Sequence, residues 1–150
     1  MTREFTEEEN RAWRAKQPQK MIVAKVVIQS NKGNILLAKS SYKKSWQMPG
    51  GGVEDGESPE EAAIRETQEE FGLALPVDSL TIKGTIYKKD EEILFIIYEC
   101  NKRFPEDIKL TTQEDEVTDF KFVDTTDAAS LLSPYYANFW KQHYNYNNLA

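Results

Sequence analysis

The sequence has few of the residues on which secreted and membrane proteins depend. Cys100 is the only cysteine among 150 residues, so an intramolecular disulfide is excluded and a reducing compartment is favoured. No apolar run approaches the ~20 residues that span a bilayer. The charged N-terminal segment MTREFTEEEN is unlike a signal peptide. These absences predict a soluble, cytoplasmic protein with no membrane partner.

Signals for nucleic-acid binding and for several domains are also missing. No long basic stripe with interleaved aromatic residues is present, so nucleic acid is not an expected partner. The one histidine, His143, stands alone and is interpreted as a surface residue rather than a ligand. Repeats, linkers and low-complexity tracts are absent, and the length suits one domain with a real core. We therefore expect a single domain over residues 1–150, with a homodimer left open.

Acidic residues are concentrated in one segment. Residues 51–73, GGVEDGESPEEAAIRETQEEFGL, hold eight acidic residues and one arginine. Glu66, Glu69 and Glu70 recur at i, i+3 and i+4, a spacing that puts their carboxylates on one face of a helix. Carboxylates so close repel one another unless a cation lies between them, and Mg²⁺ or Mn²⁺ favours carboxylate oxygens. The segment predicts metal-assisted chemistry on a phosphate-bearing substrate.

The same segment carries the signals for its own helix. Ser58 suits the N-cap, Pro59 the first helical position, and Glu61 completes a capping box. Gly72 suits the position at which the helix ends. Residues 49–52 form a glycine-rich loop whose backbone can approach a ligand or an ion closely. The expected order is glycine loop, carboxylate, capped helix and carboxylate cluster.

These residues resemble the Nudix box of the Nudix hydrolases, G-x5-E-x7-R-E-U-x-E-E-x-G-U, in which U is a bulky aliphatic residue. Within residues 51–73 the pattern is matched, with every interval correct, at Gly51, Glu57, Arg65, Glu66, Glu69, Glu70, Gly72 and Leu73. Thr67, at the first U position, is the one departure, and it concerns packing because that position should lie under the helix. The lead-in Trp46-Gln47-Met48-Pro49-Gly50-Gly51 is also similar to the family. Eight fixed positions make the match far more specific than a short motif.

The resemblance implies an α/β fold, the Nudix α/β/α sandwich with a mixed sheet. It implies a Mg²⁺-dependent pyrophosphohydrolase, in which Mn²⁺ can substitute, acting on a small-molecule nucleoside diphosphate derivative. Metal ligands would be Glu66, Glu69 and Glu70, together with a carbonyl oxygen of Gly50 or Gly51. Glu57 is expected to orient Arg65, whose guanidinium stays protonated and cannot act as a base.

The general base and the substrate contacts stay open. The base is either a signature glutamate or a carboxylate of the acidic loop, Glu114 or Glu116. We favour the loop, because glutamates that hold an ion have their lone pairs engaged and their basicity lowered. Lys39 could contact phosphate, and Tyr42 and Trp46 could stack on a base.

Two other functions remain beside hydrolysis of small nucleotides. One is removal of pyrophosphate from an RNA 5′ end, which the missing basic surface disfavours. The other is a non-catalytic Nudix-fold sensor of nucleotides, whose usual mark is loss of signature glutamates, and here all are present. Sequence tags of the ADP-ribose, coenzyme A and nicotinamide dinucleotide subclasses are missing.

Strands and helices are expected on both sides of the box. A helical N-terminal extension is expected over residues 1–18, with its helix at 5–16. Strands are expected at 20–30, 34–40, 45–48, 80–87, 92–99 and 117–123. The first two, and then 80–87 with 92–99, should form hairpins. Helices should follow at 126–132 and from Ser133 onward.

Overall fold

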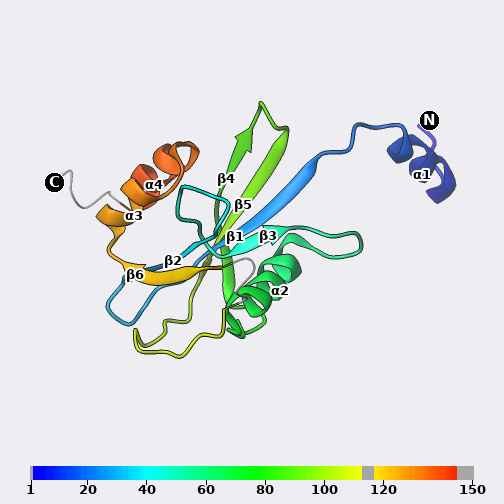
Figure 1. The fold of residues 1–150 in the computed structure, drawn as a ribbon. Coiled ribbons are helices and arrows are strands. Elements are labelled where there is room, and N and C mark those ends of the chain that lie inside the picture. Colours follow the sequence, from blue (N-terminus) through cyan, green and yellow to red (C-terminus); the bar gives the residue numbers. More distant parts are fainter. Residues whose placement is uncertain (1, 113–116, 145–150) are drawn as a thin grey trace.

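A four-stranded mixed sheet lies at the centre of the computed structural model, which describes residues 2–112 and 117–144 (Figure 1). The strand order is β3-β1-β5-β4, formed by β1 (Met21–Val27), β3 (Gly50–Gly52), β4 (Leu80–Lys88) and β5 (Ile93–Cys100). β1 runs parallel to β5 and antiparallel to β3, and β4 runs antiparallel to β5. β2 (Ile35–Lys39) and β6 (Asp119–Val123) form a second, antiparallel pair.

Helices lie on both sides of the central sheet (Figure 1). α2 (Pro59–Phe71) packs against β1 and β3, whereas α3 (Thr125–Leu131), the 3₁₀ turn η1 (Pro134–Tyr136) and α4 (Ala137–His143) lie on the other side. The alternation of side chains along β1 explains the two layers. Ala24 and Val26 join the core under α2, and Val23 and Val27 join the core around Trp140. The predicted α/β/α sandwich with a mixed sheet is confirmed.

The N-terminal helix α1 (Glu7–Ala15) stands apart from these layers (Figure 1). None of its residues is buried. Thr6 and Glu9 form a complete capping box, in which each side chain accepts a hydrogen bond from the other residue's backbone. The helix therefore begins at Glu7 and lies inside the range 5–16 expected from the sequence. None of the helices in residues 2–112 and 117–144 is long and apolar enough to cross a bilayer.

The first predicted hairpin is wrong. Residues 20–30 and 34–40 are joined by a tight turn, and Gln29 and Ile35 form an isolated bridge. Beyond this bridge the two strands separate, because both hydrogen-bonding edges of β1 are occupied by β3 and β5. β2 pairs with β6 instead. The second predicted hairpin, formed by β4 and β5, is confirmed.

The strand predicted at 45–48 is also wrong, and the glycine segment takes its place. Trp46 and Gln47 form isolated bridges, to Leu132 and Ala38. The regular strand is β3, where a loop was expected, and it pairs with β1 through Val23, Ala24 and Lys25. Glycine disfavours strands in general. Here a close approach requires it, since a Cβ on Gly50 would lie 2.0 Å from the Ala24 carbonyl oxygen.

Candidate active site

The helix of the Nudix box forms as its sequence signals predict. Ser58 and Glu61 complete the capping box, and Gly72 ends the helix in the left-handed conformation, with φ of 63°. Thr67 is fully buried, and its hydroxyl donates to the Ala63 carbonyl oxygen at 2.8 Å. The departure from the family pattern is therefore accommodated, because the one polar atom that it buries has a hydrogen-bond partner.

Arg65 holds the acidic face of α2 in place. Its Nε and Nη2 donate to the two carboxylate oxygens of Glu57 at 3.0 and 2.7 Å, so the expected ion pair is present and two-pronged. Nη1 donates to Glu66 at 3.1 Å and to Glu69 at 3.2 Å, and Nη2 also reaches the Gly52 carbonyl oxygen at 3.1 Å. The guanidinium, with the Glu54 amide, lowers the pKa of Glu57 to about 2, and the Glu57 carboxylate raises the pKa of Arg65.

Glu66 and Glu70 lie beside the glycine strand. The Gly50 amide donates to Glu70 Oε1 at 2.8 Å. A Cβ on Gly51 would lie 2.5 Å from the Glu66 carboxyl carbon, so the glycine is what lets the carboxylate approach the strand. Glu69 is turned towards Arg65, and its side chain is 48% exposed. Two of the three signature carboxylates therefore converge on β3, and the third takes part in the arginine network.

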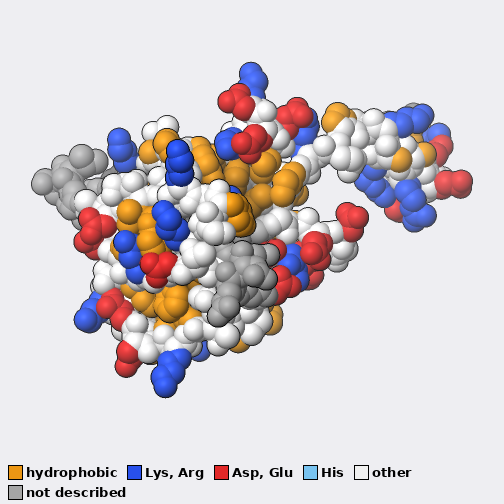
Figure 2. Space-filling view, in the orientation of Figure 1, with side chains coloured by type: hydrophobic (Ala, Val, Ile, Leu, Met, Phe, Trp, Pro, Cys, Tyr) orange, Lys and Arg blue, Asp and Glu red, His pale blue; other side chains and the backbone are white. Residues whose placement is uncertain are grey.

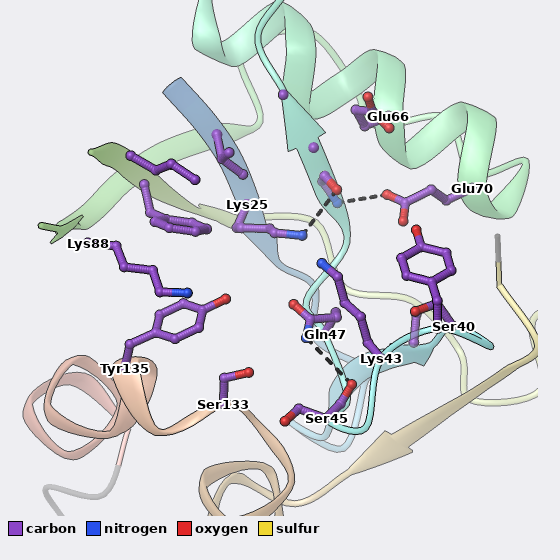
Figure 3. A pocket seen from close by; sticks show the side chains of 18 of the residues that line it. Lys25, Ser40, Lys43, Ser45, Gln47, Glu66, Glu70, Lys88, Ser133 and Tyr135 are labelled. Atoms are coloured by element: carbon purple, nitrogen blue, oxygen red, sulfur yellow. Dashed lines mark hydrogen bonds between the residues drawn. The ribbon is translucent and has the colours of Figure 1, made fainter. Parts of the chain in front are cut away.

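The donor set suits a hard divalent cation. Carboxylate oxygens of Glu66 and Glu70 and the backbone of β3 line the same cavity (Figure 3). Hard cations such as Mg²⁺ prefer such oxygen ligands. Across the described ranges, no three acidic, histidine or cysteine side chains are placed so that together they could hold a metal ion, and Glu69 in particular is turned towards Arg65. Figure 2 shows the acidic side chains gathered over α2 and the loop before it, where the arginine network also lies.

The cavity has a volume of about 590 Å³ and opens between β3, the segment after β2, and η1. Glu66 and Glu70 lie on one side of it, and five lysines line other parts together with Glu91, which forms an ion pair with Lys88 at 2.7 Å. The lysines are Lys25, Lys39, Lys43, Lys44 and Lys88. The aromatic rings of Tyr42, Phe95 and Tyr135 also line the cavity. A cavity with anionic and cationic walls can hold a metal ion and a phosphate-bearing ligand side by side.

Lys25 reaches this cavity from the middle of β1, where it is only 7% exposed. Its ammonium donates to the Met48 carbonyl oxygen at 3.3 Å and to the Gly50 carbonyl oxygen at 3.2 Å, the second of which is a dashed line in Figure 3. Burial lowers the pKa of Lys25 to about 8, although the negative charge of Glu70 opposes this shift. Sequence reasoning missed this residue. A lysine inside the apolar strand MIVAKVV was the available signal.

The substrate residues predicted from the sequence lie in two environments. Lys39 and Tyr42 line the cavity, and Tyr42 is 70% exposed. Trp46 packs against the core around Trp140, with the ammonium groups of Lys39 and Lys121 over its ring at 5.9 and 4.4 Å. Glu114 and Glu116, the predicted loop bases, lie outside the described residues.

Other cavity residues could not have been found from sequence. They come from three segments: Ser40 and Gln47 from the connection between β2 and β3, Lys88 from the end of β4, and Ser133 and Tyr135 from the η1 region. The Lys88 ammonium lies 4.7 Å from the centre of the Tyr135 ring, which also packs against Phe95. Ser40 Oγ and Gln47 Oε1 are buried and have no hydrogen-bond partner among the described parts of the chain. Gln47 lies in the lead-in to the box, but no motif joins it to the others, because only tertiary folding brings them to one cavity.

The sandwich, with its capped acidic helix beside a glycine strand, defines the Nudix type of fold, and solved structures share it. The MutT protein of Methanosarcina mazei Go1 superposes with a TM-score of 0.69 at 23% identity, over 89% of this chain and all of that one. The Escherichia coli dihydroneopterin triphosphate pyrophosphohydrolase gives 0.65 at 21% identity, over 81% and 92% of the two chains.

The family is shown by sequence. A model of the NUDIX domain matches residues 19–144, so the chain belongs to the Nudix hydrolase family. Members of this family generally use divalent metal ions.

Two curated relatives, both RNA pyrophosphohydrolases, match a shorter segment. That of Vibrio cholerae serotype O1 is 52% identical over 48 residues, which are 32% of this chain and 28% of the relative. That of Tolumonas auensis is 47% identical over 60 residues, 40% and 33% of the two chains. The match spans no more than about a third of either relative.

Proposed function

We propose that this chain is a Mg²⁺-dependent pyrophosphohydrolase that cleaves a nucleoside diphosphate linked to another group. The observation that carries the proposal is the pairing of Glu66 and Glu70 with the glycine strand on one wall of a cavity lined elsewhere by lysines. A bound Mg²⁺ or Mn²⁺ ion would polarise a phosphoryl oxygen and neutralise the charge that develops during attack by water.

In this proposal the Nudix-box residues divide into ligands and supports. Glu66, Glu69 and Glu70 would hold the metal with the Gly51 carbonyl oxygen. Arg65 fixes the direction of Glu66 and Glu69 through Nη1, and Glu57 fixes Arg65 through two hydrogen bonds. An oxygen ligand must be held within a fraction of an ångström, so supports of this kind affect turnover without touching substrate.

Substrate binding in the proposal uses the opposite side of the cavity. Lys39 would contact a phosphate oxygen, and Tyr42, exposed at the cavity rim, would stack on a nucleobase. The proposed general base is Glu114 or Glu116. Its carboxylate would accept the proton from water while the box glutamates remain engaged with the metal.

The names of the curated relatives favour a second candidate substrate, the 5′ end of an RNA. They are RNA pyrophosphohydrolases, and the local identity to them is about half. A triphosphorylated RNA end presents the same phosphoric anhydride as a small nucleotide, so the same site could act on it. The two candidates differ in the surface needed beyond the anhydride, because an RNA chain requires a basic path along its backbone.

The deciding experiment is a hydrolysis screen with Mg²⁺. The panel should contain nucleoside triphosphates, nucleotide sugars, dinucleoside polyphosphates and 5′-triphosphorylated RNA, with released phosphate, pyrophosphate or nucleoside monophosphate measured. We expect turnover of at least one small nucleotide, and near-complete loss in Glu66→Gln and Glu70→Gln. Glu8→Gln, which changes an exposed acid on α1, is the matched control and should behave like wild type.

Two results would contradict the proposal. If the box variants kept full turnover, the assignment of the site would be wrong. If the wild-type protein bound a nucleotide without cleaving any member of the panel, the sensor function would replace the enzyme. If the RNA were turned over faster than every small nucleotide, the second candidate, the 5′ end of an RNA, would be the preferred substrate.

A further inference from the structure

Lys25 is a cation in an unusual position. Among residues 2–112 and 117–144 it is the one charged side chain in the buried class. It lies opposite Gly50 in the β1–β3 register, and two of the three N–H bonds of its ammonium reach backbone carbonyl oxygens. The side chain also lines the cavity, and a dashed line in Figure 3 marks the hydrogen bond from its ammonium to the Gly50 carbonyl oxygen.

A buried ammonium needs a counter-charge. Taking a charge out of water is costly unless it is paired, and carbonyl oxygens compensate only in part. No carboxylate of the described ranges lies within ion-pair distance of Lys25. Glu70 and Glu66 are the acids whose field it feels. Both are proposed metal ligands, so a bound cation would cancel that field and leave Lys25 uncompensated.

We propose that Lys25 is a specificity-determining residue that binds an anionic oxygen of the substrate, a phosphoryl oxygen on the side of Gly50 away from Glu70. This inference rests on the proposed function and deepens it. The bound compound would carry a second negatively charged phosphoryl group beside the one at the carboxylates. An ammonium on the cavity floor, already desolvated, gives a stronger and more selective contact than lysines exposed at the rim.

An anion-binding role and a purely structural role predict opposite effects on stability. If Lys25 only tethers the carbonyls of Met48 and Gly50, Lys25→Met should lower the melting temperature. If the charge of Lys25 serves to bind an anion, replacing Lys25 with an apolar side chain of similar length removes the cost of burying that charge. Lys25→Met should then melt at or above the wild-type temperature in anion-free buffer.

The probe is inorganic pyrophosphate in the presence of EDTA, so that binding is measured without metal or turnover. We expect pyrophosphate to raise the melting temperature of the wild-type protein, and calorimetry to show at least tenfold weaker binding by Lys25→Met. Lys25→Arg, which keeps the charge, should retain part of the affinity. Lys32→Met removes a lysine that pairs with Glu106 in the turn before β2, and this control should bind like wild type. If Lys25→Met does not fold, Lys25→Gln takes its place, because it keeps a donor for the carbonyls without the charge.

The outcomes separate this inference from the proposed function. Equal pyrophosphate affinity in wild type and Lys25→Met, or no binding by wild type, would overturn the inference even if the nucleotide screen finds turnover. Binding that is lost with Lys25, beside a screen that finds no turnover, would overturn the hydrolase function and keep the anion site. Where a substrate is found, Lys25→Met should raise its KM at least tenfold, whereas a merely structural role would lower kcat instead.

Discussion

Replacing Gly51 by alanine should separate the geometry of the active site from the stability of the fold. The backbone of Gly51 is not in the left-handed region, so alanine can adopt it. The added Cβ would lie 2.5 Å from the carboxyl carbon of Glu66 and 2.7 and 2.9 Å from its two oxygens. An ordinary contact is about 3.5 Å, so the carboxylate must retreat by about 1 Å.

The size of the effect follows from which atoms move. The clash involves the far end of a flexible side chain, so the free energy of unfolding should change by less than ~1 kcal/mol. A displacement of about 1 Å in a group that positions the reacting atoms lowers turnover by roughly 10²-fold. Gly51→Ala should therefore fold normally and lose most of its activity. Metal ions should also raise its melting temperature less than they raise that of wild type.

Gly56→Ala is the matched control. Gly56 has a φ of 80° and no atom within 4 Å of the added Cβ, so alanine there strains the backbone by about 1 kcal/mol without touching the site. It should lose stability and keep its turnover, the reverse of Gly51→Ala. Thermal melts with and without Mg²⁺, and initial rates on the substrate found in the screen, would measure both. Wild-type turnover in Gly51→Ala would refute the placement of Glu66 beside the strand as a catalytic requirement.

Three further predictions concern the Arg65–Glu57 pair and the proposed general base. Arg65→Lys keeps the charge but loses the two-pronged contact with Glu57, so turnover should fall by about tenfold or more while the fold stays intact. Unchanged steady-state kinetics would show that the pair is dispensable. The pKa of Glu57 falls from 4.5 to about 2 on folding, so its pairing stabilises the protein above pH ~4.5 and is lost as the pH falls towards 2. Urea unfolding at pH 6 and pH 3 should therefore show a smaller acid loss in Glu57→Gln, and equal losses would contradict the linkage. Glu114→Gln/Glu116→Gln should lower turnover by roughly 10² while the thermal shift with Mg²⁺ stays unchanged, and wild-type turnover would remove this loop from the mechanism.

The box helix could be predicted because its signals are local. The cap residues and the terminal glycine lie within residues 51–73, and each acts within one or two helical turns, where the sequence interval fixes the distance in space. The Glu57–Arg65 ion pair was expected from the family resemblance instead, because Glu57 lies before the helix and no helical spacing fixes its distance to Arg65. The direction of Glu69 could not be predicted in this way. A carboxylate on a helix face can turn either towards a bound metal ion or towards a neighbouring arginine. Glu69 turns towards Arg65, whose Nη1 lies 3.2 Å from its Oε2.

Lys25, Lys88 and Tyr135 were not predicted as one group for a different reason. They come from β1, β4 and η1. The pairing of β1 with β5 and of β5 with β4 brings the two strands that carry the lysines into one sheet, and Tyr135 packs against Phe95 of β5. Strand pairing also turned the expected glycine loop into β3. A propensity scale places glycine in loops because it scores each residue without its neighbours in space. It therefore does not include the Ala24 carbonyl oxygen, which leaves no room for a side chain at Gly50.

Gly50 is held from both sides of its α-carbon. Glu70 accepts from its amide, and Lys25 donates to its carbonyl oxygen. A carboxylate and an ammonium therefore hold the amide and the carbonyl of one residue, whose φ is 127°. Rotation about φ or ψ turns the carbonyl relative to the amide, so the two contacts cannot be changed independently. Substitutions at Glu70 and Lys25 should consequently be non-additive although the two side chains do not form an ion pair, and selection for a new substrate that alters one contact would alter the other.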